Sequence, residues 1–180
     1  MTRTSDHSKL SPQFLNRWSP RSYTSDDIPE QDLRTLFEAA RWAPSCFNEQ
    51  PWLFAYAKGS GPDNPFWNVL VEGNQKWAHP CPVIILAFAK KHFAMDGRIN
   101  AWAPFDTGAA WMSLALQAHL MGFDAHGMGG FDQKLAYEKA DVDPEKYEVM
   151  CAIVVGKRLP TEAESPNERK PLSNMIKKID

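Results

Sequence analysis

The sequence predicts one domain in which helices and strands are mixed in layers, either three-layer α/β or α+β. Its 180 residues, 43% of them apolar, are enough to form a substantial core. Residues 83–88 are continuously apolar, which is typical of a strand covered on both faces. Residues 108–121 are apolar on nearly every side, which indicates a helix at the centre of the domain or one shared with a second subunit.

The chain is expected to begin with a flexible segment, residues 1–10, because this stretch is polar and terminal. Ser11 and Pro12 then predict a short helix, with Ser11 as the N-cap and Pro12 at the first helical position. We expect this helix to turn Phe14 and Leu15 inward.

A regular apolar stripe predicts the next helix. Its members recur at i, i+3, i+4 and i+7: Leu33, Leu36, Phe37 and Ala40. Asp26 or Asp27 is expected to cap this helix, with Pro29 near its first turn. The helix should end before Pro44, which has no N–H to donate, and a strand should follow over residues 52–57.

The second half of the chain is dominated by the central helix. A helix is predicted before it over residues 64–77, and no firm element over residues 90–104. The central helix should begin at Asp106 or Thr107, with Gly122 as the residue after its C-cap. Three elements are predicted after it: a strand over residues 123–128, a helix capped by Asp132, and a strand over residues 149–155.

Composition excludes several classes of protein. The net charge of −2 does not favour a nucleic-acid binder or a basic membrane-surface protein. The longest apolar run, residues 83–89, is far shorter than the ~20 residues needed to span a bilayer, and no apolar signal segment follows the N-terminus. The three cysteines form no CxxC motif, and their odd number argues against a disulfide framework. We therefore expect a soluble cytoplasmic protein.

Residues 17–21 predict an anion clamp. Pro20 disfavours a helix, so the segment should be extended, and alternate residues of an extended chain share a face. Arg17, Ser19 and Arg21 would then present two guanidinium groups on either side of a hydroxyl. Planar, bidentate arginine donors suit a phosphate group. Two solvated arginines on a surface strand are the alternative that the segment alone leaves open.

Residues 44–52 predict a stiff polar loop between a helix and a strand. Pro44 ends the helix, and Pro51 pushes Gln50 toward extended geometry. Polar loops held between packed elements often carry binding residues. An ordinary helix–strand junction would look similar.

Taken together, four segments resemble the FMN-dependent nitroreductase family, in the family's order, between about residues 16 and 170. Residues 17–23 resemble its Arg-x-Ser-x-Arg/Lys segment. Residues 44–52, Pro-Ser-Cys-Phe-Asn-Glu-Gln-Pro-Trp, are similar to its Pro-Ser-Ser-x-Asn-x-Gln-Pro-Trp signature. Asn74 resembles the family asparagine at the flavin edge, and residues 122–132 resemble the family loop over the flavin.

The resemblance implies an α+β fold with a mixed central sheet, dimeric and three-layered (α-β-α), formed by residues 1–180 as a single domain. Residues 157–180 would contact the partner subunit, and FMN would bind at the interface of a homodimer. The implied FMN-binding residues are Arg17, Trp18, Ser19, Arg21, Pro44, Ser45, Cys46, Asn48, Asn74, Gly127, Met128, Gly129, Gly130, Arg169 and Lys170. Arg169 and Lys170 would complete the phosphate clamp. Cys46 departs from the commoner serine and is a weaker donor.

The implied chemistry is ping-pong electron transfer from NADH or NADPH, through flavin N5, to a nitroaromatic, a quinone or a similar acceptor. The cofactor carries this chemistry, so no catalytic side chain and no metal are predicted. One alternative is a flavin-binding protein with little reductase turnover, or one with dehalogenase or oxidase chemistry. Another is thiol chemistry, with Cys46 as nucleophile and His126 or His79 as its base.

Overall fold

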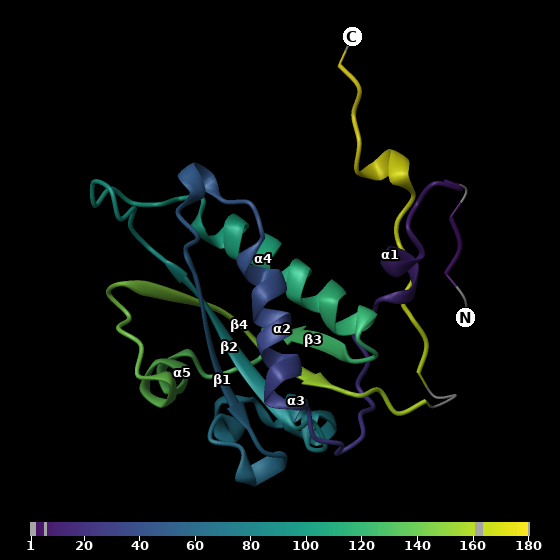
Figure 1. Ribbon diagram of the computed structural model, residues 1–180, viewed down its shortest axis with the longest axis horizontal. Coiled ribbons are helices and arrows are strands. Elements are labelled where there is room, and N and C mark those ends of the chain that lie inside the picture. Colours follow the sequence, from purple (N-terminus) through teal and green to yellow (C-terminus); the bar gives the residue numbers. More distant parts are fainter. Residues whose placement is uncertain (1–2, 6, 161–163, 180) are drawn as a thin grey trace.

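A four-stranded sheet forms the middle layer of the molecule (Figure 1). The computed structural model describes residues 3–5, 7–160 and 164–179. The strand order is β1-β2-β4-β3, with bounds β1 (Trp52–Lys58), β2 (Val83–Lys90), β3 (Asp124–Met128) and β4 (Tyr147–Gly156). All three pairings are antiparallel. The α+β class is confirmed, but the mixture of strand directions that the family resemblance implied is not found among the described residues.

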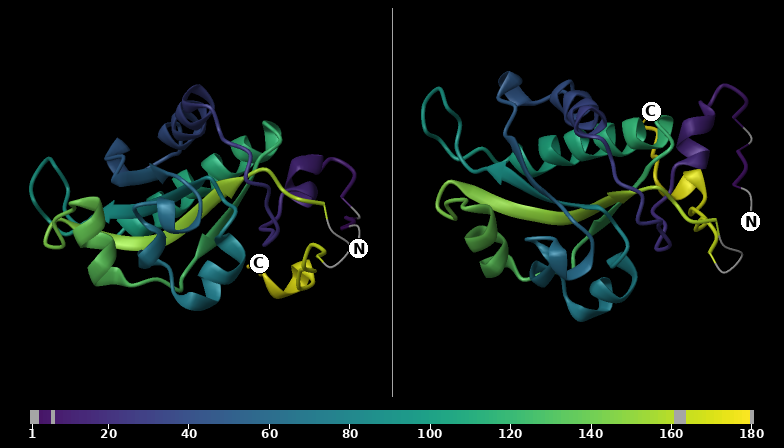
Figure 2. Two further views of the ribbon diagram at one scale, coloured as in Figure 1. Left: turned by 90° about the horizontal axis from the view of Figure 1, so that it is seen from below. Right: turned by 60° about the horizontal axis from the view of Figure 1, so that its bottom comes forward.

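Helices cover both faces of the sheet, as Figure 2 shows. Helices α2 (Glu30–Arg41) and α4 (Ala103–Leu120) pack on one face. Helix α5 (Gln133–Ala140), α3 (Glu72–Ala78) and the short 3₁₀ turn η3 (Trp67–Val69) lie on the other. Successive residues of β2 alternate between these two cores, and the strand is buried over residues 83–89. The predicted three layers and the doubly covered strand are confirmed.

The first two helices differ in detail from the prediction. Helix α1 (Pro12–Asn16) forms, but Phe14 is 51% exposed, so the inward packing predicted for it is wrong. Helix α2 begins at Glu30 with Pro29 at its N-cap position, so neither Asp26 nor Asp27 caps it. Asp27 instead pairs with Lys58 at the end of β1, 2.9 Å away. The Asp27 carboxylate, which local spacing predicted as a helix cap, thus forms a long-range ion pair.

The helix predicted over residues 64–77 is interrupted between η3 and α3. At the break, Leu70 forms an isolated antiparallel bridge with Phe131, and the Val71 N–H donates to the Gly130 carbonyl at 3.3 Å. A backbone that pairs with a distant segment cannot also complete helical hydrogen bonds. The interruption places α3 beside the loop that follows β3.

Helix α4 begins at Ala103, three or four residues before the predicted start, with Pro104 in its first turn. Proline is tolerated there because the first-turn N–H groups have no helical partners. Gly122 has φ +82° after the helix, as predicted for its C-terminus. In the single chain, α4 leaves large apolar side chains exposed: Phe105 at 76%, Leu120 at 59% and Met112 at 36%. Its surface is therefore only partly covered by its own chain.

The two terminal segments lie near each other in Figure 1. Of the first ten residues, expected to be flexible, Arg3 is fixed by side-chain hydrogen bonds to residues 15, 17 and 167, while residues 1, 2 and 6 lie outside the described part. The C-terminal segment leaves the domain and carries exposed apolar side chains: Leu172, Met175, Ile176 and Ile179. No helix in the described residues is long and apolar enough to cross a membrane.

Candidate functional site

The segment over residues 17–23 is extended, as predicted, and lies against the end of β4. Its register is fixed by a bridge between Tyr23 and Arg158 and by a hydrogen bond from the Leu159 N–H to the Ser22 carbonyl, 3.0 Å. Within it Trp18 and Pro20 are buried, whereas the residues between and beside them are partly or fully exposed: Arg17, Ser19 and Arg21. This alternation places the two arginines and the serine on the outer face.

Three guanidinium groups gather at this end of the molecule. Arg3 donates through Nη1 to the Arg17 carbonyl, 2.9 Å, and through Nε to the Asn167 carbonyl, 2.9 Å. Arg169 adds its charge to this group and donates from Nη1 to the Asn167 carbonyl at 3.3 Å. Burial, with added repulsion from Arg169, lowers the pKa of Arg3 and of Arg17. The arrangement concentrates positive charge, which is the condition for binding an anion.

Glu164 brings a carboxylate to the clamp, where it accepts from the Arg21 N–H at 2.6 Å, and a second opposing charge is the buried Asp124 at the start of β3. Its carboxylate lies 3.4 Å from Arg158 Nε and 3.5 Å from His119 Nδ1. Burial raises the pKa of Asp124, against the effect of these neighbours and of Arg17. The Arg17 Nε atom is itself buried and has no hydrogen-bond partner among the described residues. Asp124 therefore reduces the positive charge of the cluster without satisfying Arg17.

Strand β3 and helix α3 complete this end of the site. The His126 ring nitrogen Nδ1 lies 2.8 Å from the Pro20 carbonyl, and its ring centroid is 4.6 Å from that of Trp77 on α3. The Arg21 guanidinium lies over the same Trp77 ring at 5.9 Å. The clamp segment, β3 and the helix that carries Asn74 are thus packed into one unit.

Burial lowers the pKa of His126, and Arg21 lowers it further, while the Pro20 carbonyl and Glu164 oppose this shift. A histidine whose pKa is lower when folded binds more protons in the unfolded chain, so its contribution to stability is lost as pH falls below its usual pKa of about 6.5. The free energy of unfolding, measured in urea, should fall between pH 7 and pH 5. We expect this fall to be smaller in His126→Gln than in the unaltered protein. An unchanged pH dependence would contradict this assignment.

Asn74 and Gly130, predicted to lie at one edge of the flavin, are in direct contact. Asn74 Nδ2 donates to the Gly130 carbonyl at 2.8 Å. A Cβ atom on Gly130 would lie 2.9 Å from Asn74 Nδ2 and 3.0 Å from Val71 Cγ2. A methyl group at this position would therefore have to displace the Asn74 or Val71 side chain, whereas a Cβ on Gly129 would meet nothing within 4 Å.

This difference gives a matched test. We expect Gly130→Ala to lower the free energy of unfolding by about 1–3 kcal/mol, because the added methyl group displaces Asn74 or Val71. Gly129→Ala, one residue away in the same loop, should change it by less than about 0.5 kcal/mol. Urea unfolding of both apoproteins measures the difference. Equal effects would show that the contacts around Gly130 do not constrain the loop.

Two neighbouring residues of the predicted site have packing roles within the chain. Met128 is buried in the core, so its side chain does not line an open surface. A Cβ on Gly127 would lie 3.2 Å from the Trp111 ring of α4, which explains the glycine without a ligand. Only the backbone of these two residues remains available for binding. Lys170 is exposed, and its role in the clamp stays a prediction.

The signature loop is held by hydrogen bonds from both sides. The Gln50 N–H donates to Ser45 Oγ at 3.0 Å, and the Cys46 N–H donates to the buried Asp106 carboxylate of α4 at 3.0 Å. The side chain of Glu49 accepts from the Ala94 N–H at 2.7 Å. The sequence suggested Asp106 only as the start of a helix, whereas in the structure it anchors this loop.

The backbone of this loop is unusual. Three of its residues have positive φ: Phe47 at 52°, Asn48 at 58° and Gln50 at 51°. The extended geometry predicted for Gln50, before Pro51, is therefore wrong. Left-handed conformations are costly for residues other than glycine, and they concentrate at functional sites because the surrounding structure must impose them. Three within four residues indicate a loop shaped for a purpose beyond connecting α2 to β1. Pro44 and Asn48 are exposed, and Ser45 and Cys46 are partly exposed.

The predicted site residues therefore form two separate groups within one chain. The signature loop contacts the N-terminal part of α4, whereas α1 and the clamp that follows it lie toward the other end of that helix (Figure 1). The 18 residues of α4 span roughly 27 Å. A single chain does not bring Ser45, Cys46 and Asn48 to the arginine cluster.

The thiol alternative finds no support in the structure. Cys46 is anchored through its N–H to Asp106, while His126 contacts Pro20 and Trp77, and the His79 ring packs on Trp67 at 5.6 Å. Burial raises the pKa of the Cys151 thiol to about 11 and that of Cys81 further. Within the described residues no three side chains of the His, Cys, Asp or Glu type are grouped to hold a metal ion.

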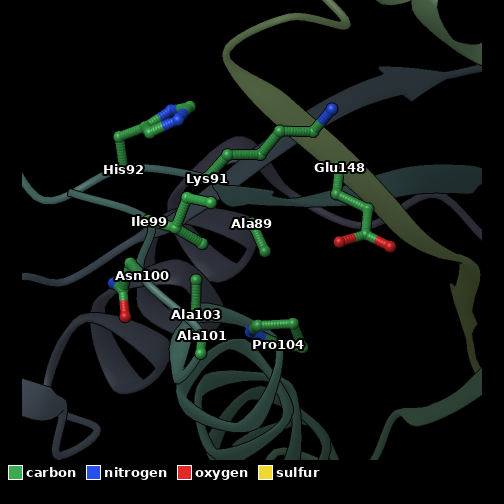
Figure 3. Close-up of a pocket in the computed structure, with 9 residues that line it drawn as sticks. All are labelled: Ala89, Lys91, His92, Ile99, Asn100, Ala101, Ala103, Pro104 and Glu148. Atoms are coloured by element: carbon green, nitrogen blue, oxygen red, sulfur yellow. The ribbon is translucent and has the colours of Figure 1, made fainter. Parts of the chain in front are cut away.

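A cavity of about 280 Å³ lies at the start of α4, and none of the predicted site residues lines it (Figure 3). Its walls include Ala89, Lys91, Ile99, Pro104 and Glu148. In Figure 3 the Lys91 side chain points away from the helix, and its ammonium donates to the Pro144 carbonyl at 2.7 Å. The Lys91 ammonium is thus hydrogen-bonded to the backbone, and the walls of the cavity are mainly apolar.

Comparison with known proteins resolves which family these features belong to. The Nitroreductase family matches residues 15–157 of the sequence. The chain belongs to the nitroreductase family. A solved structure described as an oxidoreductase containing FMN shares 38% sequence identity with it, covers 98% of this chain and 96% of its own, and has a TM-score of 0.88.

Two more distant matches are a solved structure of the same fold and a relative found by sequence. A nitroreductase-type protein of Exiguobacterium sibiricum 255-15, solved in complex with FMN, has a TM-score of 0.78 at 20% identity, over 99% of this chain and 100% of its own. A protein of Ralstonia nicotianae (strain ATCC BAA-1114 / GMI1000), named as a candidate NADH dehydrogenase/NAD(P)H nitroreductase, is 24% identical over 147 residues, 72% of this chain and 75% of its own. The predicted family is confirmed.

Proposed function

We propose that this nitroreductase-family protein is an FMN-dependent oxidoreductase that passes electrons from NADH or NADPH to a nitroaromatic, a quinone or a similar small acceptor by a ping-pong mechanism. The observation that carries the proposal is the arginine cluster of Arg3, Arg17 and Arg169. The clamp segment connects to the helix that carries Asn74 through the contact of Arg21 with Trp77. The FMN content of the 38% identical structure supports the same cofactor here.

The residues fit the phosphate end of FMN. The Arg17 Nε atom is buried without a hydrogen-bond partner among the described residues, which is costly unless a ligand satisfies it. The attraction of a phosphate dianion between the guanidinium groups would outweigh the burial and the repulsion that lower the pKa of Arg17. In this proposal Arg17, Ser19 and Arg21 hold the phosphate and ribityl groups, with Arg169 and Lys170 completing the clamp.

The second half of the site would come from a partner subunit in a homodimer. The signature loop and the arginine cluster lie toward opposite ends of α4, and α4 exposes Phe105, Met112 and Leu120. Two copies packed antiparallel along this helix would bring the Ser45–Asn48 loop of one chain to the clamp of the other. The exposed apolar side chains of residues 172–179 would then lie on the partner subunit.

FMN, when bound, supplies the hydride and electron chemistry at N5. The chain's own residues would bind and orient the flavin and exclude water from it. Asn74 and the N–H groups of Gly129 and Gly130 would line one edge of the ring system, and backbone donors at such an edge stabilise negative charge on it. Ser45 and Cys46 would line the ring from the partner's loop. No side chain is assigned as a catalytic acid or base.

Anaerobic stopped-flow reduction of the FMN-loaded protein tests the electron transfer. We expect NADH or NADPH to bleach the flavin absorbance, and a nitroaromatic or quinone to restore it in a second mixing step. Both half-reactions must proceed without the other substrate, because the mechanism is ping-pong. Tight FMN that neither nicotinamide reduces would contradict the reductase and favour a flavin-binding protein of the same fold.

A further inference from the structure

Arg3 joins two segments that are far apart in the sequence. Its guanidinium donates to the Arg17 carbonyl at 2.9 Å and to the Leu15 carbonyl at 3.3 Å, where α1 ends and the clamp begins. The same group donates from Nε to the Asn167 carbonyl at 2.9 Å, two residues before Arg169. Asn167 lies 164 residues along the chain from Arg3, so this connection has no local cause.

The planar fork of arginine is what permits this connection. Nη1 and Nε point at carbonyls of two different backbone segments, each of which carries an arginine of the cluster. The Asn167 carbonyl also accepts from Arg169 Nη1 at 3.3 Å, so Arg3 and Arg169 share one acceptor. A shared acceptor fixes the two guanidinium groups relative to each other.

Placing a third positive charge here works against the stability of the free chain. Repulsion from Arg169 and from Arg17 adds to burial in lowering the pKa of Arg3. Two neutral hydrogen-bond donors could hold the same carbonyls without this repulsion. A cation in this position gains only when an anion occupies the cluster.

We propose that Arg3 is a positioning residue of the phosphate site: it holds the Arg17 and Arg169 segments together and adds a third guanidinium charge to the field at the phosphate. The inference rests on the proposed FMN function. It assigns a binding role to the N-terminal arm, residues that precede the segment matched to the family.

The test compares two ligands that differ only in the phosphate. The Kd values of FMN and of riboflavin are measured by flavin fluorescence quenching for the full-length apoprotein, for Arg3→Ala and for Arg3→Lys. Arg34→Ala is the matched control, because Arg34 is an exposed arginine of α2 that pairs only with Glu30 in the described structure, at 3.6 Å. Titrations at several salt concentrations add the charge dependence of FMN binding.

We expect Arg3→Ala to raise the Kd of FMN roughly tenfold, about 1.4 kcal/mol, and that of riboflavin by less than about twofold. Arg3→Lys should recover part of the affinity and the full salt dependence, since it keeps the charge and loses the fork. Arg34→Ala should change neither Kd. Equal weakening of both flavins by Arg3→Ala would overturn the proposal, because it would show that Arg3 only supports the fold.

Two other outcomes separate this inference from the proposed function. Unchanged FMN affinity in Arg3→Ala, with FMN still bound by the unaltered protein, would refute the role of Arg3 and leave the proposed function standing. An unaltered protein that binds neither flavin would refute both. A preference for FMN over riboflavin in the unaltered protein is the required starting point.

Discussion

Arg17→Ala is expected to raise the Kd of FMN by roughly 10- to 150-fold. Arg17 carries a buried Nε without a partner among the described residues, and its charge adds to a cluster that Asp124 opposes in part. A hydrogen bond to a charged group contributes about 1.5–3 kcal/mol, which sets this range. Arg21→Ala should also lose flavin, by a smaller factor, because Arg21 is exposed and packs over Trp77.

Equilibrium dialysis with FMN measures the loss, and the FMN content of the purified variants checks it. Arg34→Ala again serves as the control for removing one surface arginine. The free energy of unfolding of apo Arg17→Ala should not fall, because the substitution removes repulsion between like charges. If both Arg17→Ala and Arg21→Ala retain FMN at unchanged occupancy, the phosphate-clamp assignment is wrong.

Mixing two inactive variants should restore flavin binding if each site is shared between subunits. Arg17→Ala damages the clamp half and Asn48→Ala damages the signature-loop half, and these halves lie toward opposite ends of α4. A heterodimer of the two variants would contain one site with both halves intact and one with both damaged. Random exchange at equal concentrations should therefore restore about a quarter of the sites.

The control mixture combines Arg17→Ala with Asn74→Ala. Both residues lie in the unit formed by the clamp, β3 and α3, so every site of that heterodimer keeps one defect. Bound FMN is measured after brief denaturant-assisted exchange and dialysis. No recovery in the first mixture, although tagged subunits show that heterodimers have formed, would place the whole site within one chain.

Much of the fold follows from local patterns. The apolar run of β2 predicted a strand between two cores, and the sheet places it there. Asp132 was predicted as a cap, and its carboxylate accepts from the Leu135 N–H at 2.9 Å. Such features depend on a few neighbouring residues and on burial, which the sequence displays directly.

Most errors in the predicted elements arise where contacts between distant segments determine the local structure. The helix predicted over residues 64–77 breaks because Leu70 pairs with Phe131, and Asp27 pairs with Lys58 instead of capping α2. The start of α4 was placed too late because no firm element was expected over residues 90–104, although a proline such as Pro104 is compatible with the first turn of a helix. Both contacts join residues that are at least 30 positions apart in the sequence, so local patterns do not reveal them.

The candidate site shows the same limit. The arginines of residues 17–21 and the loop over residues 44–52 could be found from their residue types and spacing. Arg3 and Asp106 could not, because Arg3 acts on residues 14 and 164 positions away and Asp106 acts on a loop 60 residues away. Met128 was assigned to the site by its place in the loop motif, but its side chain belongs to the core.

The absorption spectrum of the purified protein, followed by heat release of its chromophore, tests the central claim most directly. We expect flavin bands in the visible range and about one FMN per chain, since each site of a symmetric dimer would use one clamp and one signature loop. A colourless protein that also fails to take up added FMN would contradict the account. The arginine cluster would then need another anion, and the proposed electron transfer would be lost.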